Sequence, residues 1–252
     1  MKVSALPRPQ LTPRSPDLRP DAAGALGPVA DQVEHVAAEI VIPGFEADGV
    51  ELDAVHTTVA ALYVDPHGVY ANLPGVEVWD EARDARTYAG PWPVVAHPPC
   101  ARWSRWAGFT EAVFRLTKGE DGGCFASALE AVRTWGGVIE HPAYSEAWDA
   151  YGLPEPTVYE GWTGGICGGW SAYVEQGRYG HKAKKATWLY AYGVDPPILR
   201  WGHTPDQLHE WKVSWHGRSK GGPELTKRER SATPVEFRDV LIGIAMLAGA
   251  GG

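Results

Sequence analysis

The sequence has few cysteines and no long apolar run. Its three cysteines, Cys100, Cys124 and Cys167, are an odd number without Cys-x-x-Cys spacing, so neither a disulfide framework nor a zinc site is indicated. We interpret Cys124 and Cys167 as structural and expect no metal. The chain shows neither a leading apolar stretch of the signal-peptide type nor a run of about eighteen apolar residues. We therefore expect a soluble, cytoplasmic protein without a membrane partner.

Proline is concentrated in the first part of the chain. Residues 1–35 carry six prolines and little apolar periodicity, which is typical of a flexible tail. Residues 36–252 have the length of one domain that buries a sizeable core. We expect this domain to be α/β, with a mostly parallel sheet flanked by helices.

The most informative segment presents a cysteine directly after an apolar strand. Val94-Val95-Ala96 runs into the turn His97-Pro98-Pro99, which ends at Cys100. In open α/β sheets the functional site lies outside the carboxyl ends of the strands, so a thiol at this position indicates a nucleophile. The alternative is a buried cysteine that packs as a small apolar side chain.

A carboxylate follows a second strand in the same way. Four apolar residues from Phe125 to Val132 recur at helical spacing and predict a helix over 126–135, followed by a glycine pair and a strand that ends at Glu140. If this strand and Val94–Ala96 are parallel neighbours, Glu140 lies beside Cys100. The alternative is that Glu140 is a helix cap or a surface charge.

Three motifs lie between residues 94 and 194. Residues 98–108 read Pro-Pro-Cys, then Trp-Ser, then Ala-Gly; residues 140–142 read Glu-His-Pro; and residues 176–189 contain Gln, Gly-His and Lys-Ala-Thr-Trp-Leu. In order and spacing they resemble the Pro-Cys loop, the Glu-Asn-Val motif and the Gly-His…Lys-x-Thr-x-Leu stretch of DNA cytosine-5 methyltransferases, especially short phage and prophage members. The resemblance implies a single Rossmann-like methyltransferase-type domain over 36–252, acting on DNA in a bacterial or phage-infected host cell.

A cytosine-modifying enzyme of this family needs a thiolate and an acid. Carbon 5 of cytosine becomes nucleophilic when a thiolate adds to carbon 6 and an acid hydrogen-bonds ring nitrogen 3; the resemblance assigns these roles to Cys100 and Glu140. Positive neighbours must favour the thiolate, and Arg102, Arg105 and His97 are the candidates.

The target base must also leave the stacked duplex. Trp103 and Trp106 are candidates to stack on the base or to fill the space that it vacates. The residues that we expect around the substrate are His97, Pro99, Trp103, Ser104, His141, Gln176, His181 and Lys185.

The expected cofactor, S-adenosylmethionine, lacks its usual glycine-rich loop in this sequence. Residues 60–70 stand in its place and read as a strand and a turn with one glycine, without an obvious helix after it. The next strand, residues 76–80, ends in Asp80, an acid of the kind that holds a ribose hydroxyl. We predict Asp80, together with Asp65 in the preceding turn, as cofactor residues. The alternative for Asp80 is an N-cap for residues 81–88.

The positive charge is concentrated in residues 176–230. This stretch holds eleven Lys or Arg against five Asp or Glu, a balance of +6 in a chain of net charge −8, and it also contains four tryptophans. Cations mixed with flat rings are typical of a surface that follows phosphates and stacks bases, although a charge run is often only a solvated face. We expect Lys182, Lys184 and Lys185 at the rim of the cleft, with Lys185 nearest the pocket.

The last helix is clear in the sequence. Thr233-Pro234-Val235-Glu236 predicts an N-cap, a proline at the first helical position and a capping-box glutamate. The apolar residues from Phe237 to Leu247 form one helical face, so we expect this helix to belong to the core.

Several functions remain open at this point. The first is modification of cytosine carbon 5, most simply methyl transfer from S-adenosylmethionine. Because the covalent step does not depend on the electrophile, another one-carbon donor or a free nucleotide substrate is an alternative. The second class is a non-catalytic DNA-binding relative. A third is an amino-group methyltransferase, whose Asp-Pro-Pro-Tyr loop shares only Pro98-Pro99 with this chain.

Overall fold

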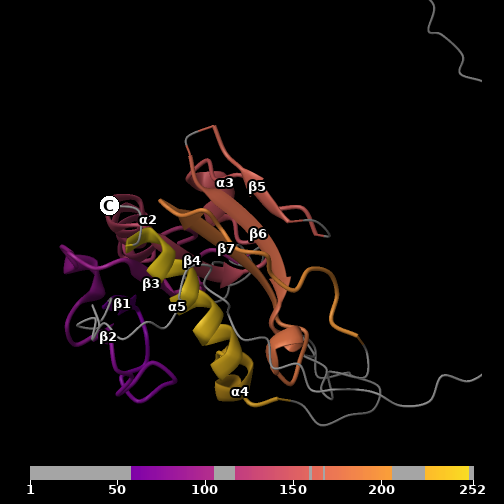
Figure 1. Ribbon diagram of the computed structural model, residues 1–252, viewed down its shortest axis with the longest axis horizontal. Coiled ribbons are helices and arrows are strands. Elements are labelled where there is room, and N and C mark those ends of the chain that lie inside the picture. Colours follow the sequence, from indigo (N-terminus) through magenta and orange to yellow (C-terminus); the bar gives the residue numbers. More distant parts are fainter. Residues whose placement is uncertain (1–57, 105–116, 159–160, 167, 206–224, 250–252) are drawn as a thin grey trace, which may run out of the picture. The chain divides into compact units, whose positions relative to one another are not determined.

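The structure is a computed structural model that describes residues 58–104, 117–158, 161–166, 168–205 and 225–249 (Figure 1). The chain divides into two units, Met1–Glu51 and Leu52–Gly252, and every described residue belongs to the second. The expected tail, residues 1–35, lies outside the described residues. Among the described residues, no helix is long and apolar enough to cross a membrane.

The described unit is built on a seven-stranded sheet with the strand order β2-β1-β3-β4-β7-β6-β5. The strands predicted within residues 60–70, at 76–80 and at 94–96, and the strand predicted to end at Glu140, are all present. The seven strands are β1 (Val59–Leu62), β2 (Val76–Trp79), β3 (Val94–Ala96), β4 (Gly137–Pro142), β5 (Trp162–Gly164), β6 (Trp170–Glu175) and β7 (Ala186–Tyr192).

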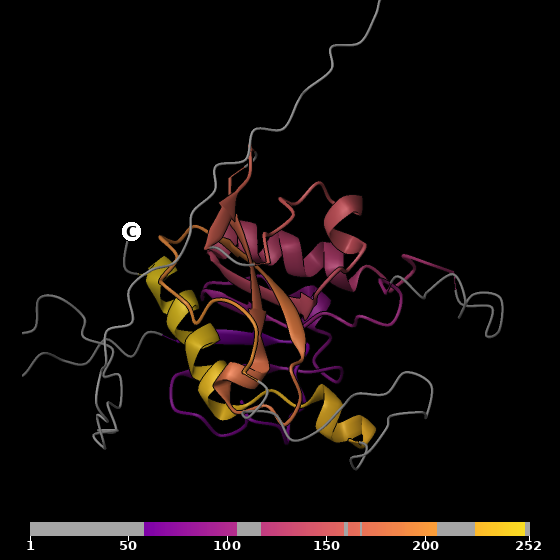
Figure 2. The ribbon, with the colours of Figure 1, turned by 90° about the vertical axis from the view of Figure 1, so that its right-hand side faces the viewer.

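The sheet has a parallel half and an antiparallel half. β1 pairs in parallel with β2 and β3, and β3 pairs in parallel with β4. β7 is antiparallel to β4 and β6, and β5 is antiparallel to β6 (Figures 1 and 2). The prediction of a mostly parallel sheet is therefore wrong. Short connections without a crossover helix join β5 to β6 and β6 to β7, and such connections produce antiparallel pairs.

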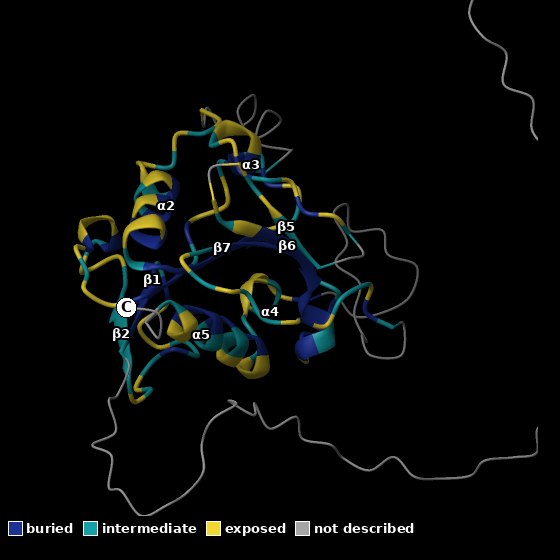
Figure 3. Cartoon of the chain, turned by 45° about the horizontal axis from the view of Figure 1, so that its top comes forward, coloured by how far each residue is buried: buried dark blue, intermediate teal, exposed yellow. Residues whose placement is uncertain are grey.

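Two helices cover opposite faces of this sheet. α2 (Cys124–Trp135) packs against β3 and β4 and buries the four residues whose spacing predicts a helix; it begins two residues before the predicted start. α5 (Val235–Gly249) packs against β1, β3 and β4 and buries Phe237, Leu241 and Ile244, as expected of a core helix. Figure 3 shows the buried strands between these helices. The shorter helices are η1 (Ala85–Thr87), α3 (Ala147–Ala150), η2 (Gln176–Tyr179) and α4 (Lys227–Ser231).

Successive strand residues contribute to two separate cores. Ile139 of β4 packs in the core that contains α2, whereas its neighbour Val138 packs in the core that contains α5. This alternation follows from the two-residue period of a strand. Continued along β4, it directs Glu140 towards the α5 face and His141 towards the α2 face. The first two motif residues of this strand therefore lie on opposite sides of the sheet.

The connection between β1 and β2 departs from the usual strand-helix-strand unit. Residues 63–75 form turns and no helix, and the connection between β2 and β3 contains only η1. Parallel strands normally need a crossover, most often helical. Here the first crossover is an extended loop that carries Tyr70 into the core on the α5 face.

Candidate active site at the carboxyl edge of the sheet

Cys100 lies at the carboxyl edge of the sheet. β3 and β4 are parallel neighbours, with Ala96 opposite Ile139, so the residues that follow β3 come close to the end of β4. A cavity of about 260 Å³ lies beside the thiol. Its lining residues are Cys100, Ser104, His141, Pro142, Ala143, Tyr144 and Ser145. The structure thus confirms the parallel pairing on which the predicted meeting of the two strand ends depends.

The surroundings of Cys100 favour the protonated form of its thiol. Cys100 is exposed as a residue, yet the atoms packed around its sulfur raise the pKa of the thiol, and the negative charge of Glu140 raises it further. The positive charge of Lys185 acts in the opposite direction. Of the cations expected to favour the thiolate, Arg105 lies outside the described residues; the structure supplies Lys185 instead.

Glu140 is buried and held by two side chains. Its Oε1 accepts a hydrogen bond from Gln176 Nε2 at 2.7 Å, and its Oε2 lies 3.0 Å from His97 Nδ1. Burial alone would raise the pKa of this carboxyl, but the His97 hydrogen bond and the positive charge of Lys185 outweigh it and lower the pKa to about 2. Glu140 is therefore a carboxylate at rest, and it can act as an acid only after it receives a proton.

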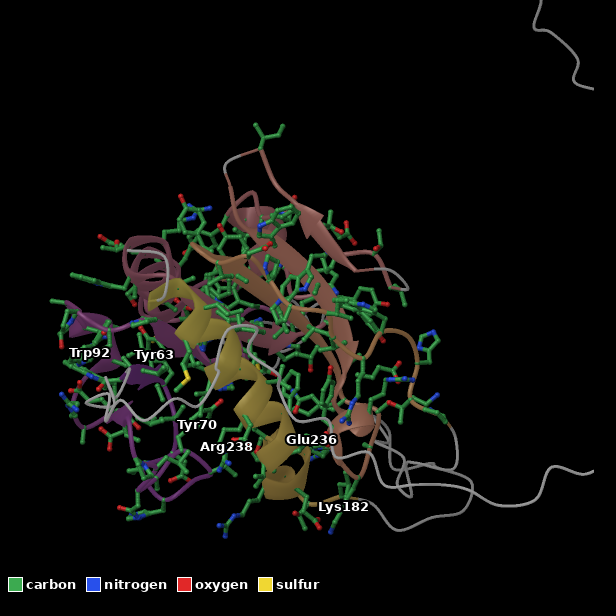
Figure 4. All side chains as sticks on the ribbon, in the orientation of Figure 1. Tyr63, Tyr70, Trp92, Lys182, Glu236 and Arg238 are labelled. Carbon is green, nitrogen blue, oxygen red and sulfur yellow. The ribbon has the colours of Figure 1, made fainter. Side chains whose placement is uncertain are left out.

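His97 connects Glu140 to a residue that the sequence does not single out. Its Nε2 lies 2.8 Å from the hydroxyl of Tyr70, which is 3% exposed and whose pKa burial raises well above the usual value. Arg238 of α5 lies near Tyr70 (Figure 4) and donates a hydrogen bond to the carbonyl of Val69. No motif marks Tyr70, because its position depends on the path of the helix-free loop.

A continuous hydrogen-bond network thus lies on the α5 face. Gln176 Nε2 also donates to Thr187 Oγ1 at 2.9 Å. We call the set Tyr70, His97, Glu140, Gln176 and Thr187 the carboxylate network. It joins the loop after β1, the ends of β3, β4 and β6, and the start of β7. The resemblance predicts three of its members as site residues.

His141 lies on the other face of the sheet. Its ring stacks near Trp148 at a centroid distance of 6.2 Å and meets Phe125 edge-on at 5.4 Å. Burial lowers the pKa of His141 to about 4, so the ring is neutral. Neither ring nitrogen has a hydrogen-bond partner within the described part of the chain. His141 and Cys100, not Glu140 and Cys100, share the lining of the cavity.

The remaining predicted substrate residues fall into different environments. Ser104 lines the cavity and Pro99 is exposed beside Cys100. Trp103 is buried in the core, where its Nε1 donates to Asp121 Oδ2, and it does not line the cavity. His181 is also buried: its Nδ1 accepts from the backbone of Ala183, so Nε2 donates to a carbonyl of α4. The structure therefore places Trp103 and His181 in supporting positions. Trp106 lies outside the described residues.

Of the expected basic rim, Lys185 reaches the site. Its Nζ donates to the carbonyl of Ala232 at 2.8 Å, burial lowers its pKa, and its charge acts on both Glu140 and Cys100. Lys182 is exposed and pairs with Glu229 at 2.9 Å. Residues 206–224 of the basic stretch lie outside the described residues.

The two predicted cofactor carboxylates are engaged in local turns. Asp65 Oδ1 accepts from the backbone N–H of His67, and Asp80 Oδ1 accepts from that of Arg83. The Asp80 contact agrees with the capping alternative. The Arg83 guanidinium also lies over the Trp79 ring at 3.9 Å. Neither carboxylate lines the cavity beside Cys100.

Beyond this edge, a second cavity of about 440 Å³ adjoins the first through Tyr144 and Ser145. Within the described residues, no group of three or more His, Cys, Asp or Glu side chains is placed to hold a metal ion. No protein-family model, curated protein or solved structure matches the chain.

Proposed function

We propose that the protein modifies carbon 5 of cytosine in DNA through a covalent adduct between Cys100 and carbon 6 of the base. One observation carries the proposal: Cys100 follows β3, and Glu140 lies near the end of its parallel neighbour β4. Glu140 and Lys185 both influence the pKa of Cys100, and a cavity lies beside the thiol. Thiol, carboxylate and cation at one strand edge are what covalent catalysis on a pyrimidine requires.

The strand order supports a Rossmann-like domain of the methyltransferase type. From β1 the chain proceeds to β2 on one side and then to β3 and β4 on the other. Open α/β sheets bind their ligands outside the carboxyl ends of the strands, near such a reversal. Cys100 follows β3, one of the two strands that flank the reversal.

The covalent step can be written with this chain's own residues. Cys100 gives its proton to water and the thiolate forms a bond to carbon 6; the C5=C6 electron pair moves to C4=C5, and the C4=N3 pair moves to nitrogen 3. Nitrogen 3 takes a proton delivered through Glu140, which leaves a neutral enamine with a nucleophilic carbon 5. The charge of Lys185 favours the thiolate and so opposes the effects of burial and of Glu140 on the pKa of Cys100. After carbon 5 has bonded to an electrophile, water removes the original carbon 5 hydrogen as a proton, the C5=C6 bond forms again, the sulfur leaves as a thiolate, and the proton on nitrogen 3 returns to Glu140.

S-adenosylmethionine is the donor that the resemblance implies, but the residues predicted to hold it do not fit this role well. Asp65 and Asp80 stabilise local turns. Tyr70 and His97 form a bond across the loops that follow β1 and β3, where an open sheet would hold a ligand. We therefore propose the covalent chemistry without assigning a step to this donor.

We further propose that the substrate is DNA and that the protein acts in the cytoplasm of a bacterial or phage-infected host cell. The target ring is stacked inside a duplex, so the base must be flipped out to reach the thiol. Lys182 and Lys184 lie shortly before β7 begins, and we expect them to contact the phosphates of the DNA. The positive balance of residues 176–230 supports this partner.

Hydrogen exchange at carbon 5 tests the proposal without any donor. Thiol addition makes carbon 5 accept a deuteron from D₂O and lose its original proton before the thiol leaves. We expect the wild-type protein to place deuterium at carbon 5 of oligonucleotide cytosines, measured by mass spectrometry of the released nucleosides. Cys100→Ser should place none, and Cys124→Ser, which changes the other described free cysteine, should behave as wild type.

The same experiment separates the second candidate, a non-catalytic DNA-binding relative. The contact between Tyr70 and His97 at the expected ligand position favours this candidate. Such a protein would bind the oligonucleotide without exchange in the wild type. A repeat with S-adenosylmethionine then shows whether 5-methylcytosine forms.

A further inference from the structure

We propose that His97, held in place by Tyr70, supplies the proton that Glu140 passes to ring nitrogen 3 of the target base. The inference rests on the proposed function and concerns the same site. It makes His97 and Tyr70 positioning and proton-supplying residues that act through Glu140. Neither the Pro-Cys motif nor the Glu-His-Pro motif predicts this role.

The geometry gives His97 one partner on each ring nitrogen. Nδ1 lies 3.0 Å from Glu140 Oε2, and Nε2 lies 2.8 Å from the Tyr70 hydroxyl. The side chains of His97 and Glu140 are only 13% and 11% exposed, so solvent has little access to the bond between them. When the imidazole is neutral, the Tyr70 hydroxyl donates to Nε2 and leaves the proton on Nδ1, facing the carboxylate. When it is protonated, Tyr70 accepts instead.

Glu140 needs such a supply because it holds no proton at rest. The hydrogen bond from His97 and the nearby positive charges keep it ionised, with a pKa of about 2. Nitrogen 3 of the base gains negative charge as the Cys100 sulfur bonds to carbon 6. One proton then moves from Nδ1 to Oε2 and one from the carboxyl to nitrogen 3. The products are a neutral enamine, an ionised Glu140 and a neutral His97.

Charged groups influence both partners of His97. On the β4 side it contacts Glu140, whose pKa is also affected by Lys185 and His141 and which in turn affects Cys100. On the side of the loop after β1 it contacts Tyr70, whose pKa is affected by Arg238 and Asp239 of α5.

A second carboxylate-histidine pair in the same protein provides a matched control. His203 Nδ1 lies 2.6 Å from Glu175 Oε1, but the His203 side chain is 49% exposed. Glu175 also accepts from the backbone N–H of Thr204 at 2.6 Å. His203→Asn therefore removes an imidazole from a buried carboxylate outside the carboxylate network.

The test is the pH dependence of deuterium exchange at carbon 5 in an oligonucleotide. For wild type we expect the rate to fall at high pH, because the relay needs a proton on His97. His97→Asn keeps a donor towards Glu140 but carries no transferable proton; it should lose this alkaline limb and exchange about 10²-fold more slowly. Tyr70→Phe should keep the limb but exchange more slowly than wild type, because the hydroxyl no longer holds the ring in place. His203→Asn should match wild type.

NMR of the His97 ring nitrogens in the folded, DNA-free protein adds a readout that does not need activity. Because each nitrogen has one side-chain partner, its signal should change in Tyr70→Phe and in Glu140→Gln, and should stay in place in His203→Asn. If wild type exchanges and His97→Asn does so at the same rate with the same alkaline limb, the proton relay is wrong but the proposed function stands. Absence of exchange in wild type would overturn the proposed function and the relay with it.

Discussion

Two buried carboxylates near one edge of the sheet each meet the Nδ1 atom of a histidine, yet their surroundings differ. Glu175, the last residue of β6, accepts from the backbone of Thr204 and from the Tyr173 hydroxyl, and its histidine is half exposed. Glu140 of β4 is held by the side chains of Gln176 and His97, both nearly buried. Thus a backbone group fixes the first carboxylate, and only side chains fix the second.

The difference indicates two roles for the same chemical pair. A backbone N–H cannot turn away, so Glu175 anchors the segment at residues 203–204 to the end of β6. The partners of Glu140 have rotamers and tautomers, and they can rearrange when a substrate arrives. Perturbed carboxylates of both kinds have lowered pKa values. A lowered pKa therefore does not distinguish a structural carboxylate from a reacting one. The distinction lies in whether the hydrogen-bond partners can rearrange.

The largest expected difference between the two pairs is in turnover. Glu140→Gln keeps the size of the side chain but removes the carboxyl that passes the proton, so the rate of carbon 5 exchange should fall by about 10²–10⁴-fold. Glu175→Gln should change it by less than about threefold, since Glu175 touches no reacting group. Similar decreases in exchange rate in Glu140→Gln and Glu175→Gln, at equal folded fractions, would show that the two carboxylates do not differ in role.

Stability should fall in both variants. In Glu175→Gln the amide NH₂ must face either the Thr204 N–H, which donates to Oε2, or the Tyr173 hydroxyl, which donates to Oε1, so we expect a loss of about 1–3 kcal/mol in the free energy of unfolding at pH 7. In Glu140→Gln, His97 can change tautomer and accept from the new amide, but the stabilisation by the ionised carboxylate is lost, so we expect a loss of similar size. Urea denaturation followed by tryptophan fluorescence measures both.

The pH dependence of stability follows from the same pKa values. The folded-state pKa of Glu140 is about 2, below its usual value of 4.5, so its contribution is present above 4.5 and is lost as the pH falls towards 2. The stability difference between wild type and Glu140→Gln should therefore shrink across this window. A difference that grows on acidification would show that Glu140 is protonated in the folded protein.

A smaller effect is expected on the reactivity of Cys100. The negative charge of Glu140 raises the pKa of the thiol and the charge of Lys185 lowers it. Iodoacetamide should therefore label Cys100 several-fold faster in Glu140→Gln and more slowly in Lys185→Met, at pH 8. Peptide mass spectrometry can follow Cys124 in the same sample as an internal reference. Glu175→Gln should leave the Cys100 rate unchanged.

Much of this site follows from the sequence because strand ends are recognisable. The apolar runs before His97 and Glu140, and the helix between them, predict parallel neighbours, and β3 and β4 are so paired. The sequence pattern does not predict that His141, and not Glu140, lines the cavity beside Cys100. It also does not predict Tyr70, because a loop without helix periodicity places it.

The antiparallel half was the harder part to predict. β5 is short and reads Trp-Thr-Gly among glycines, so no apolar run predicts it. Trp103 and His181 were expected at the substrate because of their motif positions. In the structure, Asp121 and the backbone around α4 satisfy their polar atoms instead. Short motifs thus predict which segments lie near the site better than they predict where each side chain points.

The smallest predicted effect concerns the basic stretch. If Lys182 and Lys184 meet phosphates, affinity for an oligonucleotide should fall steeply with salt, with a log-log slope near −0.9 per phosphate neutralised. Replacing both by alanine should flatten the slope by up to about two units without a change in base preference. A weak, salt-insensitive affinity in both proteins would contradict a DNA partner.

We propose above all that Cys100 adds to a cytosine while Glu140, and not Glu175, passes a proton to ring nitrogen 3. The decisive measurement is deuterium incorporation at carbon 5 by four folded proteins on one oligonucleotide. We expect deuterium with wild type, nearly as much with Glu175→Gln, far less with Glu140→Gln and none with Cys100→Ser. Absence of label in wild type, or label in Cys100→Ser, would contradict this proposal.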